Sequence, residues 1–195
     1  MIDELSSSLL FIIQKTNKNA LILAWIIAIP WVIFFITHVL NPRLLTWGIF
    51  PRHPRGLPGI LFAPLLHAHF NHLFYNSIPL LVLSDFLLIH GLTYFLIATV
   101  TITILSGLLI WLFARPGLHI GASGLITGFW GMLVSDIYQQ GTWLAFVLGL
   151  TSLYAFSGIF LGIFPRERGV SWEGHLFGLI AGILTSYCLS VGGFA

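Results

Sequence analysis

Long apolar stretches separated by short polar breaks run through the whole chain, and six of them approach the length that crosses a bilayer. A spanning helix needs about 20 mainly apolar residues. The breaks carry residues that end helices, as at Asn41-Pro42 and Arg115-Pro116-Gly117. This pattern predicts an all-α membrane protein with a single domain over residues 1–195. The expected spans are 19–40, 68–89, 92–113, 122–138, 142–163 and 173–194.

The composition excludes a soluble domain. Hydrophobic residues occupy 57% of the 195 positions and charged residues 7%, whereas soluble domains carry about 25% charged residues. A single cysteine cannot form an internal disulfide. The net charge of +2 gives no reason to expect a nucleic-acid partner, so the lipid bilayer is the expected surrounding of the chain.

The connection between the first two spans, residues 41–67, is rich in proline, glycine, arginine and aromatic residues. It is too irregular to cross a bilayer and too apolar to be a free tail. An interfacial position is therefore expected, with Trp47 at headgroup level and the arginines near lipid phosphates. These arginines are Arg43, Arg52 and Arg55.

Polar side chains are costly inside a membrane, so those in or beside the spans are candidates for function. His72 and Asn76 are four residues apart on the second span, Ser123 begins the fourth, and His175 begins the sixth. Even-numbered spans start on the same side of the membrane. The four side chains are thus expected near one membrane face, and the short fourth span places Ser123 below the surface.

Small residues recur every four positions on the two spans that carry Ser123 and His175. Gly178 and Gly182 continue such a face on the last span, and Gly124 lies beside Ser123 on the fourth. Faces of this kind let two helices approach closely in a membrane. Their crossing would bring Ser123 within hydrogen-bond reach of His175, which is the geometry of nucleophilic catalysis.

The roles follow from the chemistry of each group. His175 would accept the Ser123 proton during attack on a carbonyl and return it to the leaving amine. The backbone N–H of Ser123, at a helix start, would stabilise the oxyanion together with His72 and Asn76. Since no carboxylate is placed as a third member, a Ser-His dyad is predicted.

Three motifs carry a resemblance to a known family: HAHFNHLFYN from His67 to Asn76, GASG around Ser123, and GHLFGLIAG around His175. The chain resembles the rhomboid intramembrane serine proteases over essentially all six predicted spans. The resemblance implies a rhomboid-like six-helix bundle with Ser123 as nucleophile and His175 as base. It also implies His72 and Asn76 in the oxyanion hole and a supporting role for His67, and the glycines that support the site would be Gly121, Gly124, Gly178 and Gly182.

The resemblance further implies cleavage of single-span membrane proteins near the end of their transmembrane helix, without a cofactor. One departure is Thr127, which stands where many relatives have a tyrosine that stacks on the catalytic histidine. Trp130 or Trp172 would then have to orient His175.

Several other polar residues receive a structural interpretation. Glu173 is expected to face water, and Asp136 to lie in the loop after the fourth span. A metal site at His67, His69 and His72 is disfavoured because no HExxH pattern or carboxylate accompanies them. The segment from Phe164 to Trp172 is expected to cap the site. The histidines expected to be solvated near span ends are His38, His53 and His90.

The charges disagree with the resemblance on membrane orientation. Six arginines lie in loops on the active-site side, against Lys15 and Lys18 on the other, which would turn that side to the cytoplasm. Bacterial relatives open the site to the outside, and we follow the family, with the inner membrane of a bacterium as the expected location. The sequence leaves the oligomeric state open.

Two other functions compete with proteolysis. A catalytically inactive rhomboid-like protein that binds membrane clients would usually lack the serine or the histidine, and both are present here. A transporter or channel would need a polar path through both leaflets, whereas the polar groups gather at one end.

Overall fold

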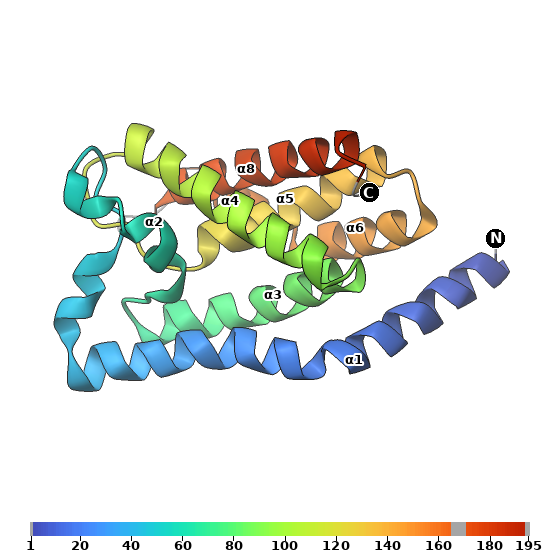
Figure 1. Cartoon of the computed structure of the whole chain (residues 1–195), viewed down its shortest axis with the longest axis horizontal. Coiled ribbons are helices and arrows are strands. Elements are labelled where there is room, and N and C mark those ends of the chain that lie inside the picture. Colours follow the sequence, from blue (N-terminus) through green and yellow to red (C-terminus); the bar gives the residue numbers. More distant parts are fainter. Residues whose placement is uncertain (1, 165–170, 194–195) are drawn as a thin grey trace.

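The computed structural model describes residues 2–164 and 171–193, and their dominant secondary structure is helix (Figure 1). Short 3-10 turns and one π-helical turn, Ile36–Leu40, connect the α-helices. Within the described ranges the only β-pairing is an isolated bridge between Ile49 and His119. The α-helices are α1 (Ile2–Phe35), α2 (Gly59–Phe62), α3 (Phe70–Ile89), α4 (Leu92–Phe113), α5 (Ser123–Gln139), α6 (Trp143–Phe156), α7 (Gly158–Leu161) and α8 (Trp172–Val191).

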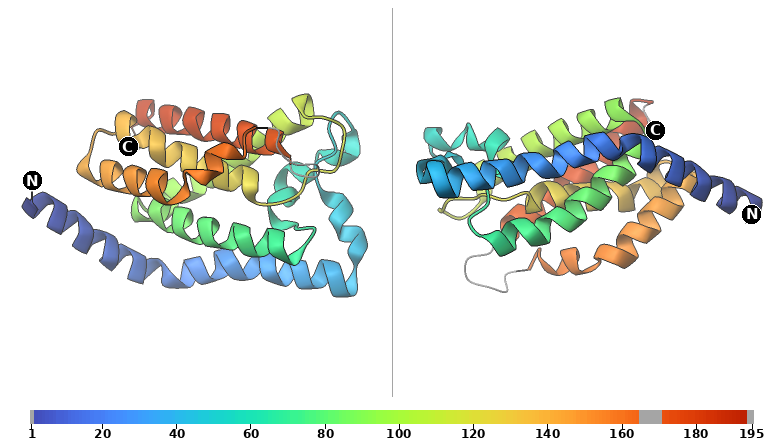
Figure 2. Two further views of the ribbon diagram at one scale, coloured as in Figure 1. Left: turned by 180° about the vertical axis from the view of Figure 1, so that it is seen from behind. Right: turned by 90° about the horizontal axis from the view of Figure 1, so that it is seen from below.

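The first helix is much longer than the sequence pattern predicts. It begins at Ile2 rather than near residue 19, and its N-terminal end projects beyond the bundle (Figures 1 and 2). Lys15 and Lys18 interrupt the apolar run without interrupting the helix, because lysine is itself a good helix former. The hydrophobic pattern located the apolar part of α1 and missed its polar extension.

Four helices are long and apolar enough to cross a membrane: α1 with its π-helical extension, α3, α4 and α8. The chain is therefore a multi-pass membrane protein. At 17 and 14 residues, α5 and α6 fall short of that length, so the six-span count is not confirmed. The bounds of α4 match the expected 92–113, and α3, α5 and α8 begin and end close to the expected positions.

The shortest of the core helices, α5, is also the central one. It contacts α3, α4, α6 and α8, and most of its middle residues are buried. Figure 1 shows α3, α5 and α8 beginning at the end of the bundle where α2 lies. The first residues of these three helices therefore share one end, as the counting of spans predicts.

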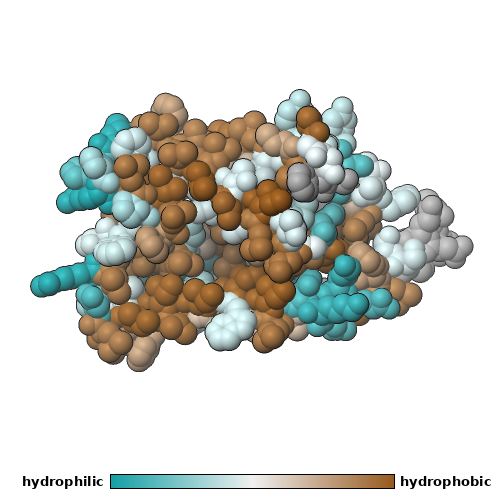
Figure 3. All heavy atoms as spheres, in the orientation of Figure 1, coloured by the Kyte–Doolittle hydropathy of each residue, from teal (hydrophilic) through white to brown (hydrophobic). Residues whose placement is uncertain are grey.

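A wide apolar band covers the face shown in Figure 3, and hydrophilic side chains gather toward the two ends of the bundle. Large apolar side chains point outward along the helices, as with Trp25, Phe113 and Val191. Cys188 is also exposed on α8. Such a surface fits lipid on the outside of the bundle, where apolar side chains meet acyl chains.

A buried carboxylate joins three helices at the end far from α2. Asp136 lies inside α5, and not in a following loop as expected from the sequence. It accepts hydrogen bonds from Tyr94 on α4 (2.9 Å) and Ser186 on α8 (2.5 Å). His90 lies against Tyr94 with its Nε2 enclosed, so the expectation that His90 is solvated was wrong.

Candidate active site

Glycines bring α5 and α8 into direct backbone contact. A Cβ atom on Gly178 would lie 2.1 Å from the carbonyl oxygen of Gly124, and one on Gly182 would lie 2.0 Å from that of Gly128. No side chain larger than hydrogen fits these positions without moving a helix. The small-residue faces read from the sequence thus pack on each other, and the helices that carry Ser123 and His175 lie side by side (Figure 1).

Ser123 is the first residue of α5 and is half-buried. Its carbonyl oxygen accepts a hydrogen bond from the hydroxyl of Thr127 at 2.7 Å, one turn further along the helix. A cavity of about 40 Å³ lies beside it, lined in part by Gly124, Ser171 and Gly174. Because the first N–H groups of a helix lack intrahelical partners, this position offers unpaired donors next to the hydroxyl.

His175 lies one turn into α8 and is half-buried. Its Nδ1 lies against the backbone of Gly162, where a Cβ atom would be only 2.1 Å away. Nδ1 is enclosed and makes no hydrogen bond of standard geometry with the described residues. Among those residues the structure also records no hydrogen bond between His175 and the Ser123 hydroxyl. The pair therefore occupies neighbouring helices with the hydrogen bond unmade.

His72 lies between the serine loop and His175. A Cβ atom on Gly121 would be 2.5 Å from Cε1 of the His72 imidazole, so the ring rests directly on this glycine. Gly121 also has a φ of +119°, a conformation that residues with a Cβ rarely adopt. His72 is close enough to His175 for their charges to interact. The glycine before Ser123 is thus required both by the backbone and by the ring beside it.

His67 connects the serine loop to α3. Its side chain is fully buried, and burial together with the charge of neighbouring His72 lowers its pKa to about 4. The ring is neutral at pH 7 and can accept hydrogen bonds. Nε2 lies 3.2 Å from the Asn76 amide nitrogen and 3.4 Å from the backbone nitrogen of Ala122. One N–H of Asn76 is used here, and its second N–H stays available for a ligand.

These contacts gather His67, His72, Asn76, Ser123 and His175 at one end of the bundle, and comparison with known proteins agrees with the arrangement. The family model described as the rhomboid domain matches residues 54–192. The chain belongs to the rhomboid family.

Relatives of this rhomboid include uncharacterized proteins of Mycobacterium tuberculosis and Mycobacterium bovis. Each is 42% identical over 174 residues, covering 84% of this chain and 72% of the relative. An uncharacterized protein of Mycobacterium leprae is 41% identical over 142 residues, covering 68% of this chain and 56% of its own length. These relatives support the family assignment and carry no information on activity.

The aromatic residue that would orient His175 is absent from the positions considered in the sequence. Trp130 donates its indole N–H to the Ser152 carbonyl (3.1 Å), and Trp172 lies beneath the guanidinium of Arg115. No aromatic ring stacks on His175 within the described part of this rhomboid. Gly162, which the sequence analysis did not consider, occupies the ring edge instead. Its four-residue spacing from Gly158 was the available signal.

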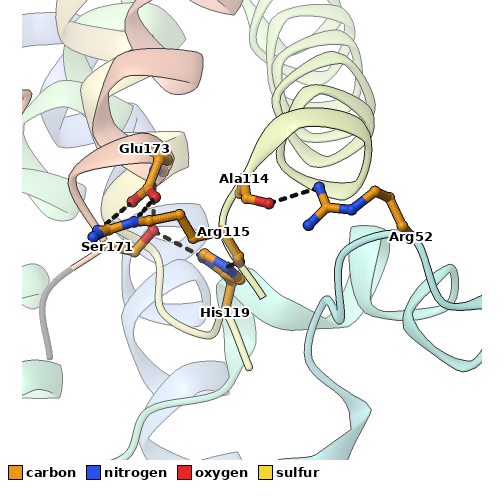
Figure 4. A network of polar contacts seen from close by, with 7 residues as sticks. Arg52, Ala114, Arg115, His119, Ser171 and Glu173 are labelled. Atoms are coloured by element: carbon orange, nitrogen blue, oxygen red, sulfur yellow. Dashed lines mark hydrogen bonds and ion pairs between the residues drawn. The ribbon is translucent and has the colours of Figure 1, made fainter. Parts of the chain in front are cut away.

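Glu173 does not face water as expected. It is buried, and both of its carboxylate oxygens are bound by the Arg115 guanidinium, whose pKa is raised by this hydrogen bond and charge (Figure 4). The neighbouring Ser171 lies 2.8 Å from Nδ1 of His119. The ion pair joins residues 58 positions apart, which no local pattern could indicate.

The described residues contain no group of three or more histidine, cysteine, aspartate or glutamate side chains that could hold a metal ion. The segment predicted to cap the site lies mostly at residues 165–170, outside the described residues.

Proposed function

We infer that this rhomboid is a serine endopeptidase that cleaves transmembrane segments within the bilayer, with Ser123 and His175 as its dyad. The observation that carries the proposal is the backbone contact of Gly178 with Gly124, which holds the starts of α5 and α8 together. A close approach of two helices otherwise needs only small residues. Here the approach coincides with a serine and a histidine at the same end.

The reaction follows from the placement of the two groups. Because Nδ1 of His175 lies against Gly162, Nε2 is the nitrogen left to accept the Ser123 proton. The Ser123 oxygen then bonds to the scissile carbonyl carbon. The amine leaves with the proton from His175, and water hydrolyses the resulting acyl-enzyme with the same base.

The oxyanion that forms on the carbonyl needs donors already in place. The backbone N–H of Ser123 and the second N–H of Asn76 are suitable, and His67 fixes the orientation of the Asn76 amide. His72 supplies a further donor from the ring that rests on Gly121. Removal of one such donor typically costs about 10²- to 10³-fold in rate.

The expected substrates are single-span proteins, because the site lies at one end of a lipid-facing bundle. We expect the protein in the plasma membrane of a bacterium, with the Ser123 end facing outward. Reporter fusions after residue 195 and within residues 41–58 would test that orientation, and a cytoplasmic signal from the connector would overturn it.

Labelling with a fluorophosphonate tests the dyad directly. The purified protein is expected to carry one label on Ser123, located by peptide mass, and to lose it in Ser123→Ala and His175→Ala. Ser157→Ala, at an exposed serine, is the matched control and should label normally. A label on Ser171, whose hydroxyl bonds to His119, would contradict the assignment.

A non-catalytic client binder is the second candidate, favoured by the unmade hydrogen bond between Ser123 and His175. It predicts that single-span proteins co-purify equally with wild type and Ser123→Ala and are left intact. Incubation of both proteins with a panel of single-span substrates, followed by mass analysis of the products, separates the two functions. Products formed by wild type alone support proteolysis.

A further inference from the structure

Two polar contacts join the loop that precedes Ser123 to the start of α8. Arg115 donates to Glu173 through Nε and through Nη2, the latter at 3.2 Å, and His119 lies 2.8 Å from Ser171 (Figure 4). Both partners on α8 lie within one turn of His175. The loop residues lie within three turns' length of Ser123, so each contact connects the surroundings of one dyad member to the other.

The hydrogen-bond directions around His119 are fixed by its neighbours. Nε2 lies 3.0 Å from the carbonyl oxygen of Arg115, which can only accept, so Nε2 carries the hydrogen. Nδ1 of the neutral ring then accepts from the Ser171 hydroxyl. The Ser171 oxygen in turn accepts from the backbone N–H of Gly174 at 3.2 Å, as an N-cap of α8. The first turn of α8 is thus bonded to the serine loop through Ser171.

The loop is itself held on its other side. The backbone of His119 pairs with Ile49 through hydrogen bonds of 2.9 and 3.0 Å, and Gly121 donates to the carbonyl of Ala63 at 2.9 Å. The loop therefore has a fixed position between the first connector and α8. A displacement of α8 along its axis would break the contacts to Glu173 and Ser171 before it disturbed the connector.

The ion pair has one exposed and one buried member. The Arg115 side chain is 67% exposed and that of Glu173 is 5% exposed. A cavity of about 260 Å³ opens over the pair and is lined also by His119 and Ser171. Loss of Arg115 would leave a buried carboxylate without its cation, which is more costly than loss of an exposed pair.

We propose that Arg115, His119, Ser171 and Glu173 form a clamp that sets the height and rotation of His175 relative to Ser123. The four are positioning residues, since they act through the dyad and do not touch the reacting atoms. This inference rests on the proposed proteolytic function. It assigns a kinetic role to an ion pair that could otherwise serve stability alone.

Charge reversal tests the clamp. Arg115→Glu and Glu173→Arg are each expected to lower kcat, and the rate constant for phosphonate labelling per folded molecule, by about 10- to 100-fold with KM little changed. The double variant restores the pair with its charges exchanged and should recover most of the rate. Arg115→Lys keeps the charge without the two-pronged contact and should give an intermediate rate. Arg43→Gln, an exposed arginine of the first connector, is the matched control.

The outcomes separate the clamp from the function on which it rests. A wild-type protein that neither labels nor cleaves would overturn both. An active wild type whose Arg115 and Glu173 variants unfold at lower temperature, yet react at the wild-type rate per folded molecule, would overturn the clamp alone. Slower reaction of the single variants with rescue in the double variant supports it.

Discussion

A Cβ atom on Gly178 would stand 2.1 Å from the carbonyl oxygen of Gly124, so α5 and α8 meet there backbone to backbone. Gly178→Ala is expected to lower the free energy of unfolding by about 1–3 kcal/mol, because a carbonyl cannot rotate out of the way. The separated helices should also label more slowly at Ser123. Thermal unfolding in detergent and the labelling rate constant measure the two effects.

The matched control is Gly158→Ala, since a Cβ atom there meets open space. It should leave both measurements close to wild type. Equal behaviour of the two variants would mean that α5 and α8 tolerate a wider separation than their contact implies.

Gly121 is expected to be irreplaceable because two independent constraints meet at it. Gly121→Ala introduces strain at a φ of +119° and presses on His72, so loss of stability should be accompanied by a large loss of activity. Gly117→Ala shares a positive φ (+156°) but has no neighbour within 4 Å. The comparison isolates the contact with His72. Similar residual rates per folded molecule in both variants would assign the defect to backbone strain.

The buried carboxylate far from Ser123 is expected to affect stability and not chemistry. Tyr94→Phe removes a 2.9 Å donor from Asp136 and should cost about 1–3 kcal/mol of unfolding free energy. The labelling rate of the folded protein should be unchanged. Tyr138→Phe, at a residue 88% exposed, is the control and should have little effect on either quantity. A slower labelling rate in Tyr94→Phe would show that this end of the bundle is coupled to the site.

The pH dependence of stability should carry a contribution from His67. Its pKa is about 4 in the folded chain against an ordinary value of 6.5, so the unfolded chain takes up a proton first as the pH falls. The unfolding free energy should therefore drop between pH 6.5 and about 4, by on the order of 3 kcal/mol from this group, and be independent of it above 6.5.

His67→Gln keeps a side-chain acceptor and cannot titrate, so its stability should fall less steeply over that range. His69→Gln, at an exposed histidine, should follow the wild-type curve. Parallel curves for wild type and His67→Gln would place the proton elsewhere.

The sequence predicted those parts of the fold that depend on local spacing. The four-residue recurrence of Gly174, Gly178 and Gly182 indicated a helix face for close packing, and that face lies on α5. The family motifs around Ser123 and His175 predicted their placement at the starts of two helices. Their catalytic roles stay predictions until Ser123 is labelled.

Features that depend on tertiary contact were missed. Nothing in the local pattern near Glu173 revealed Arg115, and a buried carboxylate at Asp136 reads as a loop residue until its donors on α4 and α8 are known. Lys15 and Lys18 ended the apolar run but not α1, because helix propensity and hydropathy are separate properties.

Asp136 ties α5 to α4 and α8 at one extremity, while Arg115 and Ser171 tie the serine loop to α8 at the other. Prising α5 from α8 would break fastenings at both extremities as well as the glycine contact between them. A polypeptide on its way to Ser123 therefore enters without wedging these two helices apart, and the seam between them stays shut through a catalytic cycle.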